Sequence, residues 1–402
     1  MKKNIRAFLE KIVEGIFLLS GSITSLVVIL IILFLFKEGW GLFGKSPVDK
    51  NTIIAINPSN PVQNLTSAQV RDIFDGKITN WKQVGGMTDT IIRFTLDDIS
   101  TYYNDSALGP DLSFLPQRVS ELFAKQKNII GYFPREYVAK NFGGKELPMA
   151  TMTFLGFVKG REWIPTATPV AQFGIMPIIL GTLWVSILAI VIALPLGLAT
   201  AIFLAEIADA RIAKILKPMI ELLAGIPSVV YGFFGLIIIV PMVQKVFNLP
   251  VGETGLAGSL VLAIMALPTI ITVSEDAIRN TPRSMKEASL ALGATHWQTI
   301  YKVIIPYSLS GISAAAILGI GRAMGETMAV LMVTGNAAVM PHSILEPLRT
   351  IPATIAAELG EVDHGGLHYK ALFALGCVLF IMTFVINIIV EAISNQNKSK
   401  TR

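Results

Sequence analysis

Two charged side chains, Arg322 and Glu326, interrupt a long apolar run in the second half of the chain. Because they are four residues apart, a helix would place them on one face. Charges at membrane depth are costly and usually face a bundle interior or a water-filled path. Arg322 could offer its fork of N–H donors to an oxyanion, with Glu326 neutralising it when the anion is absent. The pair could equally be a structural ion pair that locks helix packing, and residue chemistry alone leaves both possibilities open.

The same run contains Gly321 and Gly325, which have the spacing of a close helix contact.

A polar segment between two apolar runs, residues 277–306, has the punctuation of two short helices. Thr281 is predicted to be the N-cap of the first helix, and Pro282 its first helical residue. Gly293 predicts a left-handed helix stop. Thr295 and Gln298 have capping-box spacing and are expected to open a second helix that leads into the next apolar run.

Other signs of chemistry are weak. His364 and His368 have the spacing of metal ligands, but Gly365 and Gly366 between them argue against a shared helix face, so we expect no metal site. No phosphate-cradling loop is predicted, and we expect the chain neither to hold a cofactor nor to hydrolyse ATP. The only cysteine, Cys377, lies in an apolar run, which excludes a disulfide within the chain.

The composition is that of a polytopic membrane protein. Hydrophobic residues make up 52% of the 402 residues and charged residues only 15%, whereas soluble proteins carry about a quarter charged residues. A membrane crossing needs about 20 apolar residues, and six runs are that long. They are Glu14–Phe36, Phe173–Leu204, Met219–Val243, Gly255–Val273, Tyr307–Val333 and Ala371–Val390.

The distribution of basic residues predicts the orientation, because Lys and Arg are in excess in short cytoplasmic segments. The segments that we assign to the cytoplasm contain Lys2, Lys3, Arg6 and Lys11; Arg211, Lys214 and Lys217; Arg279, Arg283, Lys286 and Lys302; and Lys398, Lys400 and Arg402. The short segments on the other side contain Lys245, Arg349 and Lys370. Both termini and the 277–306 segment are therefore expected in the cytoplasm.

The long segment between the first two runs, 37–168, is rich in charge and has no spanning run. It is large enough for a small domain, which we expect outside the cytoplasm. Thr66 and Gln69 have capping-box spacing and open a short helix, and Asp75-Gly76 ends it. Thr52–Ile56 is predicted to be a buried strand, so the domain is expected to be α+β.

The polar segment resembles the cytoplasmic coupling loop of ABC importer permeases. The signature of that loop is Glu-Ala-Ala, three residues, Gly, nine residues, Ile, any residue and Leu-Pro. Glu287, Ala288, Gly293 and Pro306 match it, and Ser289 is a conservative departure. The resemblance implies that these five residues couple the chain to a separate ATPase.

From Gly181 onward the chain resembles the C-type permease subunit of the bacterial phosphate-specific ABC transporter. The stretches that match best are Gly225–Gly232, Gly319–Val330 and Thr350–Glu358. In that family the arginine and the glutamate of the fifth-helix motif are implicated in phosphate transport. The motif match implies this role for Arg322 and Glu326, with Thr327 beside them in the substrate path.

The charged segment is similar to one lobe of the soluble phosphate-binding proteins that feed such transporters, over Ile56–Thr66, Ile73–Gly86 and Lys127–Phe133. Those proteins clamp phosphate between two lobes with a Gly-Ser-Gly-Thr-Arg-like loop, where this chain has Arg93–Asp98. The two aspartates there would repel an anion. We expect a single lobe that does not bind phosphate alone and that acts in docking or gating.

The fold expected is an all-α polytopic membrane protein, a type I ABC importer permease with six transmembrane helices and a small α+β extracytoplasmic inserted domain. The expected parts are a cytoplasmic segment and first helix at 1–36, the one-lobe domain at 37–168, a permease core at 169–393 with its coupling loop at 277–306, and a cytoplasmic tail at 394–402.

The function expected is that of a permease subunit of an ATP-driven importer of inorganic phosphate in the bacterial plasma membrane. The expected partners are a second permease, two ATPase subunits that hold ATP and Mg²⁺, an extracytoplasmic phosphate-binding protein and membrane lipid, with no nucleic acid. The alternatives are a permease for sulfate, molybdate or tungstate, because charge alone does not distinguish tetrahedral anions, and a membrane-anchored phosphate sensor.

Overall fold

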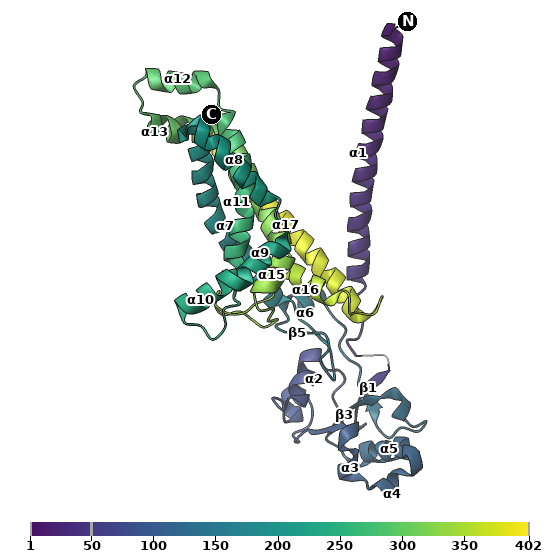
Figure 1. Ribbon diagram of the computed structural model, residues 1–402. Coiled ribbons are helices and arrows are strands. Elements are labelled where there is room, and N and C mark those ends of the chain that lie inside the picture. The colour runs from purple at the N-terminus through teal and green to yellow at the C-terminus, as the bar shows by residue number, and fades with distance from the viewer. Residues whose placement is uncertain (1, 49–50, 401–402) are drawn as a thin grey trace. The chain divides into compact units, whose positions relative to one another are not determined.

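The computed structural model describes residues 2–48 and 51–400, and the chain divides into two compact units (Figure 1). The helical unit combines the chain up to Trp40 with the residues from Pro177 onward, and the insert spans Gly41–Met176. The last two residues of the predicted tail at 394–402 lie outside the described residues, and 394–400 continue the last helix.

Six helices of the described chain are long and apolar enough to cross a membrane, as predicted. These spans are Lys11–Trp40, Met176–Ile207, Ser228–Phe247, Gly255–Arg279, His296–Gly325 and Leu367–Ala392. The helices of the unit are α1 (Lys2–Trp40), α7 (Met176–Ile202), α8 (Ala210–Ala224), α9 (Ser228–Phe234), α10 (Val240–Phe247), α11 (Gly255–Arg279), α12 (Arg283–Ala291), α13 (His296–Thr299), α14 (Ile305–Gly325), α15 (Met328–Val333), α16 (Ile351–Glu358) and α17 (Leu367–Lys400). Three π-helical turns join them, η5 (Phe203–Ile207), η6 (Gly235–Ile239) and η7 (Ile300–Ile304).

The prediction of one helix over Met219–Val243 is wrong. The chain forms two helices there, because α8 ends at Ala224 and α9 begins only at Ser228. Pro227 stands between them, and a proline disfavours helical backbone in the residue before it and donates no amide hydrogen. The span therefore consists of α9 to α10, and α8 is a separate helix outside it.

The core of the helical unit forms around α11. Val261, Leu262, Met265 and Ile270 of this helix are almost completely buried in one cluster that includes residues of α7, α9, α14 and α15. Small residues allow α14 to approach α11 closely: a Cβ added at Gly319 of α14 would lie 3.0 Å from the Ile270 side chain of α11. Helices α11 and α14 thus pack closely along their lengths.

Helix α1 contacts α17 near its own C-terminal end. The rings of Phe34 and Phe373 are 5.5 Å apart, and those of Phe36 and Phe380 are 6.2 Å apart. The Sγ of Cys377 donates to the Leu35 carbonyl oxygen at 3.4 Å. The preceding turns of α1 expose their apolar side chains, as expected of a helix that faces lipid.

The insert contains a mixed four-stranded sheet in the order β2-β3-β1-β4, in which β3 is antiparallel to β1 and parallel to β2. The strands are β1 (Thr52–Ile56), β2 (Ile92–Thr95), β3 (Ile129–Pro134) and β4 (Lys145–Glu146), and a separate hairpin pairs β5 (Trp163–Ile164) with β6 (Gln172–Phe173). The helices are α2 (Ser67–Phe74), α3 (Ile99–Tyr102), α4 (Asp105–Leu108), α5 (Leu115–Lys125) and α6 (Phe154–Lys159).

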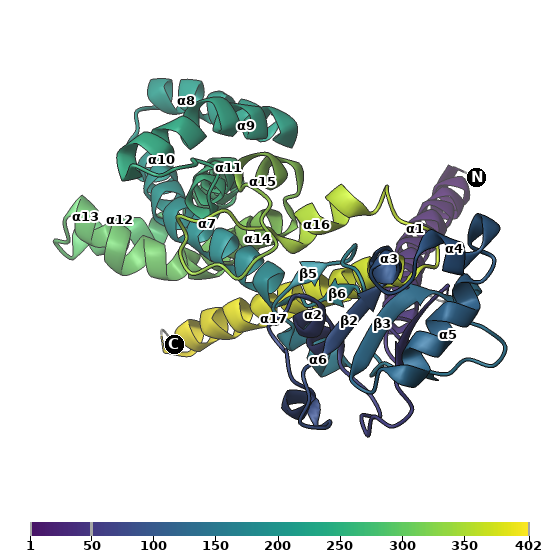
Figure 2. The same cartoon turned by 90° about the horizontal axis from the view of Figure 1, so that it is seen from below.

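Alternation along β1 explains why both faces of this sheet are covered. Ile54 and Ile56 lie in one buried cluster with α2, and Ile53 and Ala55 lie in another with α5. Figure 2 shows α5 beside the β2–β3 part of the sheet. The α+β prediction is confirmed, as are the strand Thr52–Ile56 and the capping box at the start of α2.

Candidate translocation site and coupling surface

The helix that carries Arg322 ends three residues later. The backbone is helical to Gly325, extended at Glu326 (φ −69°, ψ 131°), and helical again from Met328. The predicted run to Val333 is therefore broken, and Arg322 and Glu326 do not share one helix face. Non-helical backbone at membrane depth is tolerated only where protein or a water-filled cavity surrounds it. The break is therefore expected to face protein or water and not lipid.

Arg322 and Glu326 have different partners. Nη1 of Arg322 donates to Oγ1 of Thr269 on α11 at 3.3 Å, and the Glu326 carboxylate accepts from the Ala329 amide at 3.4 Å. Among the residues that the structure describes, no ion pair joins the two. The structural ion pair, one of the two possibilities raised by the sequence, is thus not formed. Glu326 instead accepts a hydrogen bond from the first turn of α15, whose N-cap is Thr327.

The predicted close helix contact at Gly321 and Gly325 is wrong within this chain, because a Cβ added at either position meets nothing within 4 Å. A cavity of about 540 Å³ opens at the break instead, and Gly325 and Thr327 are in its wall together with residues of α16 and α17. Arg322 and Glu326 do not line it. Of the three predicted path residues, only Thr327 contacts this cavity.

The polar segment folds into the two predicted helices, α12 and α13, which project from one end of the helical unit (Figures 1 and 2). Gly293 has φ +84°, and the amides of Gly293 and Ala294 donate to the carbonyl groups of Leu290 and Ser289. This is the Schellman arrangement that a glycine stop predicts. The capping box of Thr295 with Gln298 is also present.

Thr281 does not cap α12 as predicted, because the N-cap residue is Pro282. Thr281 is buried, and its hydroxyl lies 3.1 Å from that of Ser308 on α14. It therefore ties the start of the α12 segment to the fifth span.

One face of α12 is tied to the helical unit. Nζ of Lys286 lies 2.5 Å from Oε1 of Glu206 in η5, and the Ser289 hydroxyl lies 3.0 Å from that of Thr299. Glu287 and Ala288 are exposed on the other side, and Leu292 is 90% exposed at the tip. Apolar side chains exposed on a polar projection are typical of a protein-docking surface.

Pro306 lies in the first turn of α14. The five predicted coupling residues thus divide between the exposed side of α12 (Glu287, Ala288), its inner side (Ser289), its stop (Gly293) and the start of α14 (Pro306).

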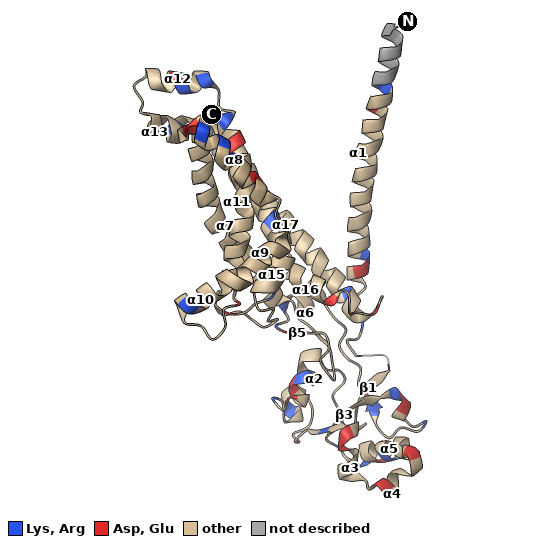
Figure 3. Cartoon of the chain, in the orientation of Figure 1, with Lys and Arg blue, Asp and Glu red and all other residues tan. Residues whose placement is uncertain are grey.

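Next to this projection lies a buried acid that the sequence analysis did not identify, Glu275 of α11. It is 1% exposed, and its carboxylate lies 2.6 Å from Nε of Arg279 and 3.3 Å from Nζ of Lys217 on α8. Arg279 also donates to the Leu204 carbonyl at 3.0 Å. Figure 3 shows charged residues gathered at this end of the unit, where the chain passes between spans. The carboxylate thereby joins α11 to α8, and Arg279 extends the connection to η5.

Lys217 lies on α8, outside the membrane spans. Partial burial lowers its pKa, but the hydrogen bond and the negative charge of Glu275, with a contribution from Asp276, outweigh this and raise the pKa above the ordinary lysine value. The acids beside Lys217 therefore favour its cationic form.

Comparison with known proteins now identifies the family. The model of the binding-protein-dependent transport system inner membrane component matches residues 193–399, more than half of the chain. The chain belongs to this family. It is a permease subunit of an ABC importer and a multi-pass inner-membrane protein.

Two relatives illustrate how closely the permease is matched. It is 42% identical over 242 residues to the probable ABC transporter permease protein YqgH of Bacillus subtilis, covering 60% of this chain and 78% of the relative. It is 37% identical over 264 residues to the phosphate transport system permease protein PstC of Mesorhizobium japonicum, covering 61% and 79%. The predicted resemblance to the C-type permeases is confirmed.

The insert has relatives of its own. A PBP superfamily domain model matches residues 38–101. A solved ABC-type phosphate transport receptor from Vibrio cholerae is 25% identical, with a TM-score of 0.19, and the match covers 26% of this chain and 48% of the receptor. The predicted resemblance of the insert to a binding-protein domain is supported by the family model.

The prediction that the chain has no Gly-Lys-Ser signature is wrong, because Gly39–Ser46 of this permease matches the Gly-x-x-x-x-Gly-Lys-Ser pattern of a phosphate-binding loop. That loop requires a strand before it and a helix after it. Here the pattern begins inside α1 and leads toward β1. The segment therefore matches the sequence pattern but does not have the strand–loop–helix structure of a phosphate-binding loop.

His368, which has metal-ligand spacing from His364, is in a hydrogen-bonded network of the permease. Nε2 of His368 lies 2.8 Å from the Glu358 carboxylate, which also lies 2.6 Å from Nη1 of Arg349. The described residues contain no group of three or more histidine, cysteine or acidic side chains that could hold a metal ion. The network joins α16 to the start of α17.

Proposed function

We propose that this permease is one of the two membrane subunits of an ATP-driven importer of inorganic phosphate. The observation that carries the proposal is the similarity of its core to proteins named phosphate transport system permease, at 37% identity to the Mesorhizobium japonicum protein and 38% to that of Pasteurella multocida. Two permeases would form the path of such an importer, so a second permease is proposed as a partner, and the chain itself is expected to perform no hydrolysis.

Arg322 is proposed as the anion contact. Its guanidinium has five N–H donors in a fixed fork, and one of them is used by Thr269 within the described chain. Because Glu326 is engaged by the backbone of α15, it does not neutralise Arg322 directly. A cation held at membrane depth by a neutral hydroxyl keeps its charge available for a transient oxyanion.

Coupling to the ATPase is proposed to begin at the exposed side of α12. Movement of α12 would reach the path by a continuous route, because the span His296–Gly325 leads from the projection to the helix break. At 1.5 Å per residue, this span of 30 residues extends about 45 Å. The Lys286–Glu206 pair provides a second connection, to the end of the α7 span.

The proposed orientation places the α12 projection and both termini in the cytoplasm, where ATP is available, and the insert outside. The insert is proposed to act in docking or gating, and not to bind phosphate as a full two-lobed receptor does. In the Arg93–Asp98 segment the Asp98 carboxylate accepts from the amide and hydroxyl of Thr95, so the loop is closed on itself by an acid.

The proposal is tested by uptake of radiolabelled phosphate into proteoliposomes that contain this permease, its partner permease, the ATPase and the binding protein. We expect ATP-dependent phosphate accumulation that excess sulfate or molybdate does not reduce. Competition by one of these anions at equal concentration would assign the chain to that oxyanion. Phosphate-dependent signalling without any accumulation would favour the membrane-anchored sensor.

A further inference from the structure

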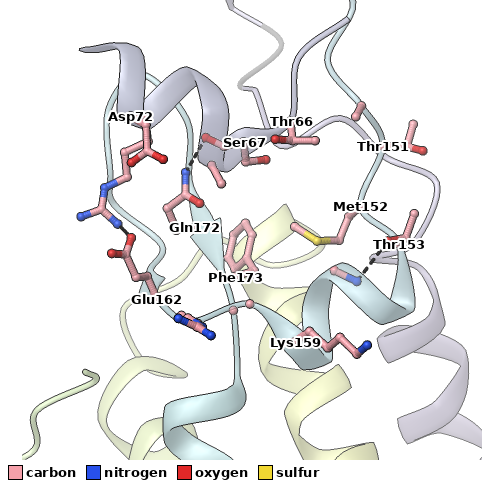
Figure 4. Close-up of a pocket in the computed structure, with 17 residues that line it drawn as sticks. Thr66, Ser67, Asp72, Thr151, Met152, Thr153, Lys159, Glu162, Gln172 and Phe173 are labelled. Carbon is pink, nitrogen blue, oxygen red and sulfur yellow. Dashed lines mark hydrogen bonds and ion pairs between the residues drawn. The ribbon is translucent and has the colours of Figure 1, made fainter. Parts of the chain in front are cut away.

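The insert contains a cavity that the transport mechanism does not use. Its volume is about 480 Å³, within the range of small-molecule sites, and its wall is formed by the start of α2, the chain at 150–153, α6 and the β5–β6 hairpin. Figure 4 shows Met152 and Phe173 between the Ser67 end of α2 and the Lys159 end of α6. The cavity lies outside the Arg93–Asp98 segment, which occupies the place of the receptor family's phosphate loop.

The charges of the wall leave two cations unmatched. Arg71 is ion-paired with Glu162, and Asp72 lies 3.3 Å from Nζ of Lys77. Lys159 and Arg161 are exposed, and neither has an ion pair with another described residue. An anionic group in this cavity would therefore meet a net positive wall.

Polar donors and apolar surface lie on different parts of the same site. The hydroxyl groups of Ser67 and Thr151 line the cavity and make no hydrogen bond with another described residue. Phe154 and Leu155 of α6, which lie in sequence between the lining residues Thr153 and Gly156, are 53% and 59% exposed. A ligand with an anionic oxygen-rich head and an apolar tail would satisfy both parts.

The covalent chain keeps this site close to the membrane. Gly174 lines the cavity and is two residues before Met176, where a span begins, so the two are at most about 7 Å apart. On the other wall, the amide of Met152 donates to the Lys45 carbonyl, and the Gly44 amide donates to the Met152 carbonyl. Residues 44 and 45 follow the end of the α1 span at Trp40 by only a few positions.

We propose that this cavity binds a phosphate group, and that its source is the head of an anionic phospholipid in the leaflet next to the insert. Lys159 and Arg161 would pair with the phosphate oxygens, Ser67 and Thr151 would donate hydrogen bonds, and Phe154 and Leu155 would lie against the glycerol and acyl region. The insert would thereby be held at the membrane surface. This inference does not depend on which anion the permease carries.

The test uses the full-length permease in nanodiscs of phosphatidylcholine with or without phosphatidylglycerol of the same acyl chains. Hydrogen exchange of segment 150–174 and native mass spectrometry report site occupancy and bound lipid. We expect phosphatidylglycerol to protect this segment and to add one retained lipid. In Lys159→Gln/Arg161→Gln the apparent affinity should fall about tenfold to thirtyfold, the loss expected for two surface cations.

The matched control is Lys125→Gln/Lys140→Gln, which removes the same charge from exposed positions of the insert outside the cavity. A second variant, Thr151→Trp, fills the cavity without changing charge and should also abolish the protection. Inorganic phosphate added to phosphatidylcholine discs distinguishes the source: protection by it alone, lost in the double glutamine variant, would assign free phosphate as the ligand. Equal protection in all variants, or none in the wild type, would overturn the site.

Discussion

At the scale of single residues, the break after Gly325 decides how Arg322 and Glu326 act. Their spacing in sequence predicts a pair on one helix face, but the backbone leaves the helix between them. Arg322 is held by Thr269, which is 53 residues away along the chain. No sequence pattern connects these two residues, because their proximity depends on the packing of α11 against α14.

The first prediction concerns Arg322 itself. Arg322→Gln should reduce phosphate uptake at least tenfold, because the charge and the donor fork are lost while the side chain stays polar and of similar length. Arg322→Lys should also be impaired, since an ammonium does not reproduce bidentate geometry. Uptake of labelled phosphate and membrane abundance are measured together.

Glu326→Gln is the matched comparison, because it retains an oxygen acceptor for the Ala329 amide. We expect a smaller loss of uptake in this variant than in Arg322→Gln. Since no ion pair joins the two residues, neither single change should reduce membrane abundance. Full uptake by an Arg322→Leu/Glu326→Leu variant would contradict the proposed anion contact.

At the scale of elements, local rules predicted the six spans and two of the three N-caps, at Thr66 and Thr295 but not at Thr281, and predicted breaks poorly. Hydropathy located the six spans because lipid requires about 20 apolar residues, and Thr66 and Thr295 each formed the capping box that their spacing indicates. Apolar composition does not reveal where a helix stops inside an apolar run. The breaks near Pro227 and Gly325 were therefore missed, as was the buried Glu275.

The second prediction concerns the connection of α12 to the α7 span. Glu206 is 7% exposed, so Lys286→Glu would place two negative charges together in a poorly solvated site, at a cost of about 1–3 kcal/mol after allowance for the partial exposure of Lys286. We expect phosphate-stimulated ATPase activity and uptake to fall together. The exchanged pair, Lys286→Glu with Glu206→Lys, should recover a large part of both.

Lys214→Glu on α8 provides the control, because it makes the same change of charge at an exposed position. It should leave coupling unchanged. If the exchanged pair behaves no better than Lys286→Glu, the ion pair is not the connection.

The third prediction concerns Gly293, whose φ of +84° a Cβ would strain. Gly293→Ala should destabilise the stop of α12 by roughly 1–2 kcal/mol and lower ATP-dependent uptake, although the added methyl group meets no neighbour within 4 Å. Gly360→Ala, which has open space but no positive φ, serves as the control. Equal uptake in both variants would show that the conformation of the stop does not matter for coupling.

At the scale of the whole molecule, the insert and the helical unit bury separate sets of residues. The insert buries Phe94, Phe123 and Phe133 in a cluster that contains no residue of the helical unit. The helical unit has its own cluster around α11. Each unit should therefore be able to unfold while the other stays folded.

The fourth prediction follows from this separation. Phe123→Ala should destabilise the insert by about 3–5 kcal/mol, because Phe123 is completely buried among aromatic rings. Limited proteolysis should then cut the insert rapidly while the membrane helices stay protected. Leu112→Ala, at a half-exposed position of the same unit, should change proteolysis little. Simultaneous loss of the helical unit in Phe123→Ala would show that the two cores fold as one.

The pairing of α1 with α17 has a consequence for the order of events during synthesis. Leu35 and Cys377, whose atoms meet in the finished protein, are 342 residues apart in the chain. At about 5–20 residues per second, the ribosome needs roughly 17–70 s to make the second after the first. During that interval α1 is in the bilayer without α17 to pack against. A chain truncated before α17 would contain α1 without its packing partner.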